Sequence, residues 1–280
     1  MKKKWTLTDP GLLIILVDQS TFVTIENKTT YATDVVNNLI NFLIMRNFDG
    51  KKAKNRCYVQ VISTECHASK LVSGFLQELE ENPLRYNEVI KKVCDGDGGL
   101  MEVKVKVPLW VEPIYEYKGT DMMGAFEIAK EIVSKWIQDK PSHPAPVIIN
   151  ISNGLPYDGR EVEECMAETI DIVNQIKDLN TADGKVQIFN ALIRDGETII
   201  FPKSQSQLDS IEAQFLFEIS TNISFIEEFE RYLLRDEIPI SLSQSSKLFY
   251  RYKDHDSKKI LESFMDYCQY MNYVYYRNER

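Results

Sequence analysis

The feature that most constrains the fold of this chain is an unbroken aliphatic run near its start. Residues 12–17 read Leu-Leu-Ile-Ile-Leu-Val, follow Pro10 and Gly11, and are succeeded by Asp18. A strand covered on both faces reads as a continuous apolar run, whereas a strand with one solvated face alternates apolar and polar residues. Strands of the first kind are typical of parallel sheets, which need crossover connections. The run therefore predicts the first strand of a mostly parallel α/β sheet.

The rest of the chain alternates between strand-like and helix-like segments. Short apolar segments are separated by longer ones in which apolar residues recur every three or four positions. This order predicts an α/β fold with a doubly wound, mostly parallel sheet and helices on both faces. The predicted strands are residues 57–62, 101–107, 146–151, 186–193 and 198–201, and the predicted helices are residues 30–46, 122–137, 161–179, 206–217 and 223–234.

The composition changes after Pro239, which suggests a boundary. Residues 241–246 are rich in Ser and Gln, and residues 242–280 are rich in Tyr, Lys and Asp, with a predicted helix at residues 260–276. We therefore expect a domain at residues 1–236 and a C-terminal helical extension at residues 237–280. All of the strands predicted for the sheet precede Pro239, so deletion of residues 242–280 is expected to leave the core folded.

Charge and cysteine usage exclude several classes of protein. The chain carries 33 Lys and Arg against 42 Asp and Glu, a net charge of −9, which argues against nucleic-acid binding by bulk charge. No stretch approaches the ~18 apolar residues of a membrane helix, and the basic residues 2–4 are not followed by the apolar segment of a signal peptide. The 5 scattered cysteines contain no C-x-x-C motif. We expect a cytoplasmic protein without membrane insertion, disulfide framework or zinc site.

Polar clusters follow the predicted strands where a binding site is expected. In open α/β sheets, ligands bind beyond the carboxyl ends of the strands. Carboxylate and hydroxyl oxygens gathered from separate loops are the ligands that Mg²⁺ prefers. Three such clusters are Asp18-Gln19-Ser20-Thr21 after the first strand, Gly119-Thr120-Asp121 before a helix, and Ser152-Asn153-Gly154 after a later strand.

The order of these clusters resembles the von Willebrand factor A domain over residues 11–229. In that family a metal-ion-dependent adhesion site is built from an Asp-x-Ser-x-Ser loop, a Thr before a helix and an Asp after a later strand. Asp18, Ser20 and Thr120 match three of these positions, and Asn153 stands at the fourth. The resemblance is to bacterial stand-alone A domains, such as those of tellurium-resistance-type and other stress or conflict systems. It implies a protein partner whose carboxylate completes the coordination of Mg²⁺.

The motif departs from the family pattern at two positions. Phe22 replaces the second Ser of the first loop, and Asn153 replaces the closing Asp. The metal-ion-dependent adhesion site is therefore degenerate, and the resemblance implies that it loses one direct ligand and one of its two carboxylates. We expect weak Mg²⁺ binding through Asp18, Ser20, Thr120 and Asn153. Other oxygens that could compensate are those of Thr21, Thr24, Asp158 and Asp121, although Asp121 at a helix start is expected to act as a cap.

Three functions are compatible with these residues. The first is a non-enzymatic module that binds a protein partner through the loops at the carboxyl ends of the strands, assisted by Mg²⁺. The second is a Mg²⁺-dependent phosphoester hydrolase that uses Asp18, although such a site needs a second carboxylate and a nearby Lys, whereas the later strand ends in Ser152-Asn153. The third is a structural subunit whose site has decayed. We expect the first.

Overall fold

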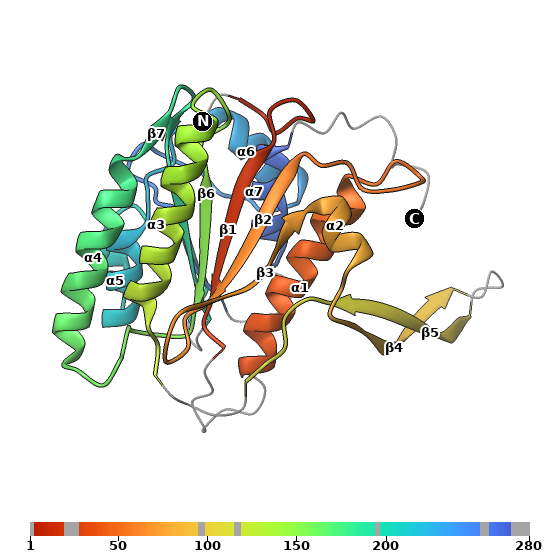
Figure 1. Ribbon diagram of the computed structural model, residues 1–280. Helices are drawn as coiled ribbons and strands as arrows, with labels where there is room; N and C mark the ends of the chain where they lie inside the picture. Colours follow the sequence, from red (N-terminus) through yellow and green to blue (C-terminus); the bar gives the residue numbers. More distant parts are fainter. Residues whose placement is uncertain are drawn as a thin grey trace.

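The computed structural model describes residues 3–19, 28–94, 99–114, 119–193, 197–252 and 258–269. Within these residues the centre of the molecule is a seven-stranded sheet with the order β10-β11-β9-β6-β1-β2-β3 (Figure 1). The inner strands run parallel to one another, and the strands at the two edges run antiparallel to their neighbours. The strands are β1 (Gly11–Val17), β2 (Cys57–Ser63), β3 (Ser69–Phe75), β6 (Val147–Ser152), β9 (Gln187–Ile193), β10 (Ile199–Ile200) and β11 (Phe249–Tyr252).

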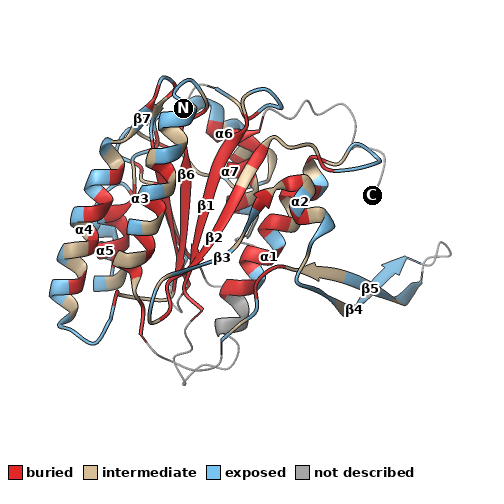
Figure 2. Cartoon of the chain, viewed as in Figure 1, coloured by how far each residue is buried: buried red, intermediate tan, exposed pale blue. Residues whose placement is uncertain are grey.

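Helices cover both faces of this sheet, which confirms the predicted doubly wound α/β fold. Strand β1 shows why, because Leu13, Ile15 and Val17 belong to one apolar cluster while the alternate residues belong to another. Both faces of its aliphatic run are thus buried, as Figure 2 shows for the whole strand. The first face is covered by α1 (Lys28–Arg46), α6 (Ile226–Arg235) and α7 (Lys258–Cys268), and the second by α3 (Met122–Asp139), α4 (Val162–Asp178) and α5 (Ile211–Ile219).

The C-terminal segment contributes to the core, which corrects the expectation that every sheet strand precedes Pro239. Strand β11 lies between β9 and β10 and pairs in parallel with β9. Helix α7 packs against α1 and α6, and its Phe264 ring lies 5.2 Å from that of Phe189 in β9. The boundary expected after residue 236 therefore does not separate the strands of the sheet from the rest of the chain. Helix α7 ends at Cys268, and the later part of the helix expected at residues 260–276 lies outside the described residues.

The N-terminal residues pack between the end of α7 and the start of β1. The Trp5 side chain is 1% exposed, and its backbone N–H donates to Cys268 O at 2.9 Å. The indole lies on the backbone of Gly11, where a Cβ atom would approach the ring to 2.2 Å. Only glycine at the start of β1 leaves room for this contact, so the run that defines the fold begins at a residue fixed by packing.

A long hairpin projects from this body. Strands β4 (Arg85–Cys94) and β5 (Leu100–Leu109) form their own antiparallel two-stranded sheet, which extends away from α1 and α2 (Leu76–Glu81) in Figure 1. The alternation at residues 101–107 predicted the second of these strands correctly. Smaller elements are β7 (Asn180–Thr181), β8 (Gly184–Lys185) and the 3-10 helix η1 (Gln205–Gln207). Among the residues that the structure describes, none of the helices combines the length and apolar composition needed to cross a membrane.

Candidate functional site

The candidate site lies at the carboxyl ends of β1, β2 and β6, at the lower end of the sheet in Figure 1. Parallel pairing places Val17 of β1 beside Ser63 of β2 on one side and beside Ile151 of β6 on the other. The three strands therefore end at the same level, and the residues that follow each of them are brought together. This is the position at which open α/β sheets bind ligands.

Asp18 occupies the middle of this edge. It is only 2% exposed, and its backbone N–H donates to Ile151 O at 2.9 Å. Its Oδ2 accepts a hydrogen bond from Thr120 Oγ1 at 3.4 Å. Two of the predicted metal ligands, separated by about a third of the chain, are thus neighbours. A buried carboxylate needs such partners because it has lost most of its hydration.

Backbone hydrogen bonds hold Thr120 in place from two sides. Thr120 N–H donates to Tyr157 O at 2.6 Å, Tyr157 N–H donates back to Thr120 O at 2.9 Å, and Cys66 N–H donates to Gly119 O at 3.3 Å. Gly119 has φ +100°, and a Cβ atom there would come within 2.6 Å of Tyr157 O. The glycine before Thr120 is therefore required for this crossing of two loops. The backbone of Thr120 is thus fixed by hydrogen bonds on both sides, and its hydroxyl donates to Asp18.

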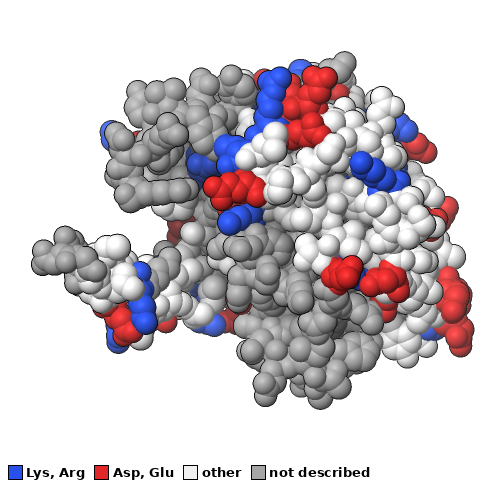
Figure 3. Space-filling view, turned by 180° about the vertical axis from the view of Figure 1, so that it is seen from behind, with Lys and Arg blue, Asp and Glu red and all other residues white. Residues whose placement is uncertain are grey.

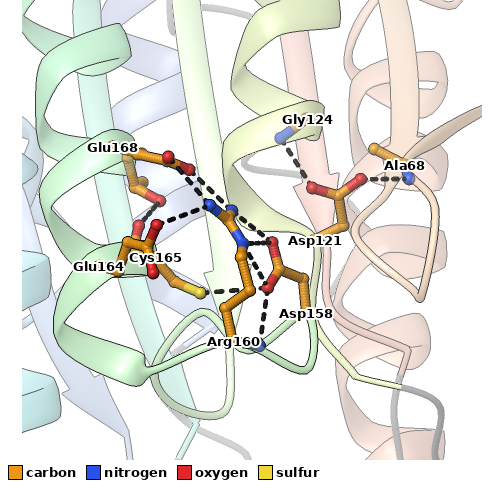
Figure 4. A network of polar contacts seen from close by, with 9 residues as sticks. Ala68, Asp121, Gly124, Asp158, Arg160, Glu164, Cys165 and Glu168 are labelled. Carbon is orange, nitrogen blue, oxygen red and sulfur yellow. Dashed lines mark hydrogen bonds and ion pairs between the residues drawn. The ribbon is translucent and has the colours of Figure 1, made fainter.

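Asp121 is a helix cap, as the sequence predicted. Its Oδ1 accepts from Gly124 N–H at 2.9 Å at the start of α3, and its Oδ2 accepts from Ala68 N–H at 3.0 Å (Figure 4). The two carboxylate oxygens thus join α3 to the loop that follows β2. A ligand role for Asp121 would compete with both of these hydrogen bonds.

Asp158 is held by an ion-pair network on the surface. Arg160 donates to Asp158 Oδ2 at 2.6 Å and to Glu168 Oε2 at 2.7 Å, and Cys165 Sγ donates to Asp158 Oδ1 at 3.3 Å (Figure 4). The hydrogen bonds from Arg160 lower the pKa of both Asp158 and Glu168. Burial raises the pKa of the Cys165 thiol. The charge of Asp158 is therefore balanced by Arg160, which argues against its use as a replacement ligand.

Asn153 follows β6 in a tight turn. Ser152 Oγ donates to Gly154 O at 3.0 Å and accepts from Gly154 N–H at 3.2 Å. Because Ile151 is level with Val17, this turn places the half-buried Asn153 at the same edge as Asp18. The remaining predicted ligand, Ser20, lies outside the described residues, as do Thr21, Phe22 and Thr24.

Two further buried residues lie at this edge, and the sequence analysis assigned a role to neither of them. Glu65 is 8% exposed and forms a backbone bridge with Thr120, and Gln19 is 2% exposed and donates from Nε2 to Glu112 O at 2.6 Å. Glu65 comes two residues after the end of β2, which pairs with β1. That position was the available signal, because residues after neighbouring parallel strands meet at one edge.

The oxygen atoms at this edge are chemically suited to bind a hard cation, but they carry little negative charge. Among the described residues no group of three or more His, Cys, Asp or Glu side chains could hold a metal ion. Asp18 and Thr120 nevertheless offer a carboxylate and a hydroxyl oxygen 3.4 Å apart, and both residues are buried. Mg²⁺ accepts such oxygens and keeps several waters, so the residues fit a weakly held Mg²⁺.

Comparisons with known proteins are informative for the fold. No family model matches the chain, and no curated protein matches its sequence. The structure is similar to the pilus adhesin SpaC from Lactobacillus rhamnosus GG in its open conformation, with a TM-score of 0.51 and 11% identity over 94% of this chain and 30% of that one.

Two further solved structures give lower scores. They are von Willebrand factor type A from Catenulispora acidiphila, with a TM-score of 0.45 and 13% identity over 92% of this chain and 42% of that one, and BatB from Bacteroides thetaiotaomicron, with a TM-score of 0.45 and 11% identity over 91% and 96%. The chain spans less than half of the adhesin and of the Catenulispora protein. At these identities the likeness concerns the fold alone.

Proposed function

We propose that this chain, which has a von Willebrand factor A-like fold, is a non-enzymatic module that binds a protein partner at the carboxyl edge of its sheet. The observation that carries the proposal is the contact between Asp18 and Thr120, at 3.4 Å. It joins two loops that the sequence resemblance assigns to one adhesion site. The similar fold of a pilus adhesin is a precedent for partner binding by this architecture.

The residues that would hold Mg²⁺ are Asp18, Ser20, Thr120 and Asn153. When bound, the ion would supply a positive charge that accepts the carboxylate of a partner protein. Asp18 would supply the anionic oxygen, and Thr120 a neutral one in a position fixed by Gly119 and Tyr157. The partner's acidic side chain would then add the negative charge that the chain itself lacks at Asn153.

The hydrolase hypothesis has less support. Phosphoester hydrolysis with a metal needs several anionic ligands to fix the ion and orient the substrate. At this edge, Asp121 caps α3 and Asp158 is paired with Arg160. We expect no release of p-nitrophenol from p-nitrophenyl phosphate in the presence of Mg²⁺ or Mn²⁺, and turnover that depends on Asp18 would contradict the interaction-only proposal.

The cellular setting follows only from the resemblance to bacterial stand-alone A domains. We propose a bacterial stress or conflict system, and the expectation of a cytoplasmic location stays a prediction. Neighbouring genes for a kinase, a phosphatase or a secretion component would discriminate among these systems.

Metal binding tests the site directly. We expect calorimetric titration of the full chain to give a Kd for Mg²⁺ no tighter than about 1 mM, equivalent to about −4 kcal/mol. Asp18→Asn and Thr120→Val should abolish the binding signal of Mg²⁺ and Mn²⁺. Asp158→Asn is the matched control, since it removes a carboxylate from the same edge that Arg160 already neutralises. Loss of binding in the control, or unchanged binding in Asp18→Asn, would show that other residues hold the ion.

Restoration of the family motif gives the converse test. Phe22→Ser combined with Asn153→Asp returns one hydroxyl ligand and one carboxylate, so binding should tighten by at least about tenfold, or about 1.4 kcal/mol. The two changes act on one coordination shell and should not be additive. Micromolar binding by the unaltered chain would instead mean that another oxygen, such as that of Glu65, already completes the shell.

A further inference from the structure

Among the described residues, strands β4 and β5 pair only with each other, so neither outer edge of the hairpin has a neighbouring strand there. Side chains of directly paired residues lie on the same face of a two-stranded sheet, and successive residues alternate between faces. The register pairs Val89 with Val105, Asn87 with Val107 and Val93 with Met101. The more apolar of the two faces, called the apolar face here, therefore carries Val89, Val93, Met101, Val103, Val105 and Val107, and it is interrupted by the positions of Asn87 and of Lys91, which pairs with Val103.

The opposite face, called the polar face here, carries charges of both signs together with the exposed apolar side chains of Tyr86, Ile90 and Leu100. Glu88 is paired with Lys106 and Lys92 with Glu102, while Lys104 Nζ lies 3.9 Å from Glu88 Oε2. These charges are solvent-exposed, and Figure 3 shows basic and acidic side chains on the projecting hairpin at the left of the view.

Two strands are too few for a stable sheet in water. An isolated hairpin is marginally stable, and three or more strands are needed before an apolar face supports the fold. The outer edge of β5 also presents a row of backbone N–H and C=O groups over a ten-residue strand. An unpaired edge of this length is a template for another strand.

We propose that β5 pairs antiparallel with β5 of a second copy of this chain, with the two-fold axis at Val103. The resulting sheet has the order β4-β5-β5-β4 and is continuous across the axis. In this register Val103 faces the partner's Val103, and Val105 faces the partner's Met101. The proposal rests on the hairpin alone and is independent of the Asp18 site.

Charge complementarity selects this register and this partner. It places Lys104 opposite the partner's Glu102 and Glu102 opposite the partner's Lys104, so two opposite-charge pairs form on the polar face. An axis at Glu102 or at Lys104 would put that residue opposite its own copy. An axis at Val105 would oppose Lys104 to the partner's Lys106 twice. The sequence of β5 is therefore self-complementary in one register.

The outer edge of β4 is less suited to the same pairing. The register that matches Glu88 with the partner's Lys92 would also set Asn87 against the partner's Val93 on the apolar face. An amide opposite an apolar side chain gains no hydrogen bond from it. Strand β5 offers valine or methionine at every apolar position from 101 to 107.

Disulfide trapping tests the axis at the level of single residues. In a Cys94→Ser background, which removes the exposed native thiol of the hairpin, we expect Val103→Cys to form a covalent dimer under mild oxidation. Directly opposed Cα atoms in antiparallel pairs are about 4.5–5.5 Å apart, within disulfide range. Val105→Cys is the matched control, since the two copies of residue 105 would be about 14 Å apart. Equal cross-linking of both variants, or none in either, would overturn the register.

Charge exchange tests the same interface without cross-links. We expect the full chain to dimerise in sedimentation experiments, and Glu102→Lys and Lys104→Glu each to weaken the dimer by about tenfold or more, because each creates two like-charge pairs. The double variant Glu102→Lys/Lys104→Glu should dimerise again, and a mixture of the two single variants should give a heterodimer. A chain that stays monomeric at all concentrations would overturn the proposal, and the hairpin would then be expected to pair with a different protein.

Discussion

The hairpin of residues 85–109 and the C-terminal segment of residues 242–269 both lie outside the regular strand–helix alternation, yet their environments are opposite. The hairpin projects from the body, and Ile90 and Leu100 are 63% and 68% exposed. The C-terminal segment inserts β11 between two strands and places α7 on the sheet, where Phe264 is fully buried. A segment that falls outside the strand–helix alternation can therefore be either exposed or part of the core.

The difference follows from how many neighbours each strand has. Strand β11 is hydrogen-bonded on both edges, and its Phe249 and Tyr250 side chains are buried in the apolar clusters on opposite faces of the sheet. Strands β4 and β5 have only one another within the described residues. We therefore expect changes in the C-terminal segment to affect the free energy of unfolding, and changes in the hairpin to affect association.

The largest expected effect comes from deletion of each region. Removal of residues 242–280 should abolish cooperative thermal unfolding, because each large buried side chain contributes about 1.5–3 kcal/mol and total stability is only about 5–15 kcal/mol. Replacement of residues 85–109 by a short Gly-Ser linker should leave a cooperative transition. Leu84 N–H donates to Leu109 O at 2.8 Å, so the cut ends are adjacent. Calorimetry measures both variants. The comparison would be refuted if the variant without residues 242–280 unfolded cooperatively and the variant without the hairpin did not.

Single substitutions should show the same contrast on a smaller scale. Phe264→Ala removes a ring that lies 5.2 Å from Phe189 and 5.6 Å from Phe229, and should cost about 3–5 kcal/mol. Ile90→Ala in the hairpin should change the free energy of unfolding by about 0.5 kcal/mol or less, since the side chain is already in water. Chemical denaturation measures both values. Similar losses would mean that the hairpin is folded into the cooperative unit.

A buried ion-pair network sharpens the comparison for charged residues. Asp266 of α7 is 2% exposed, accepts from Arg46 Nε at 3.0 Å and from an amino group of Arg235 at 2.9 Å. Asp266→Asn should cost about 3 kcal/mol, because two guanidinium groups lose their shared counter-charge. Glu88→Gln in the hairpin removes an exposed pair with Lys104 and should cost about 0–1 kcal/mol. If both substitutions lowered the free energy of unfolding equally in the same denaturation series, the contrast between the buried and the exposed ion pair would be wrong.

The same contrast explains what could be predicted from the sequence. Strands β1, β6 and β9 are buried on both faces and predominantly apolar, with Asn150 and Asn190 as interruptions within β6 and β9, so they were predictable. Strand β11 reads Phe-Tyr-Arg-Tyr, and Arg251 argued against a central strand. The structure accommodates this charge because Arg251 pairs with Asp209 and donates to Glu197 O at 2.8 Å. These are contacts across more than forty residues, which no local pattern reveals.

The candidate site was predictable to a similar extent. The fold rule located Asp18 at the carboxyl end of a strand, and the resemblance to the von Willebrand factor A domain placed Thr120 in the same site; the structure has the two side chains in contact. Glu65 could not be assigned, because its position depends on β2 being the neighbour of β1. The pairing of Asp158 with Arg160 could not be inferred either, since a carboxylate in a turn looks equally suited to a metal.

The smallest expected effect concerns two lysines between α4 and the C-terminal segment. Lys177 and Lys247 both donate from Nζ to Glu218 O, at 2.9 and 3.2 Å. Burial, followed by the nearby charge of Lys247, lowers the pKa of Lys177 to about 8, from an ordinary value of 10.5. Between these values the unfolded chain binds more protons than the folded one, so the stability contribution of this group rises with pH. Below about pH 8 its charge opposes folding.

Lys177→Met should therefore be more stable than the unaltered chain at pH 7, and the difference should shrink as the pH rises from about 8 towards 10.5. The comparison is made between variants at each pH, so that the contributions of all other groups cancel in the difference. Lys106→Met is the control, since this lysine is exposed on the hairpin and its removal should have no such pH-dependent effect. A stability difference for Lys177→Met that is the same at pH 7 and pH 10, measured by thermal unfolding, would show that the methionine acts through packing and not through the buried charge.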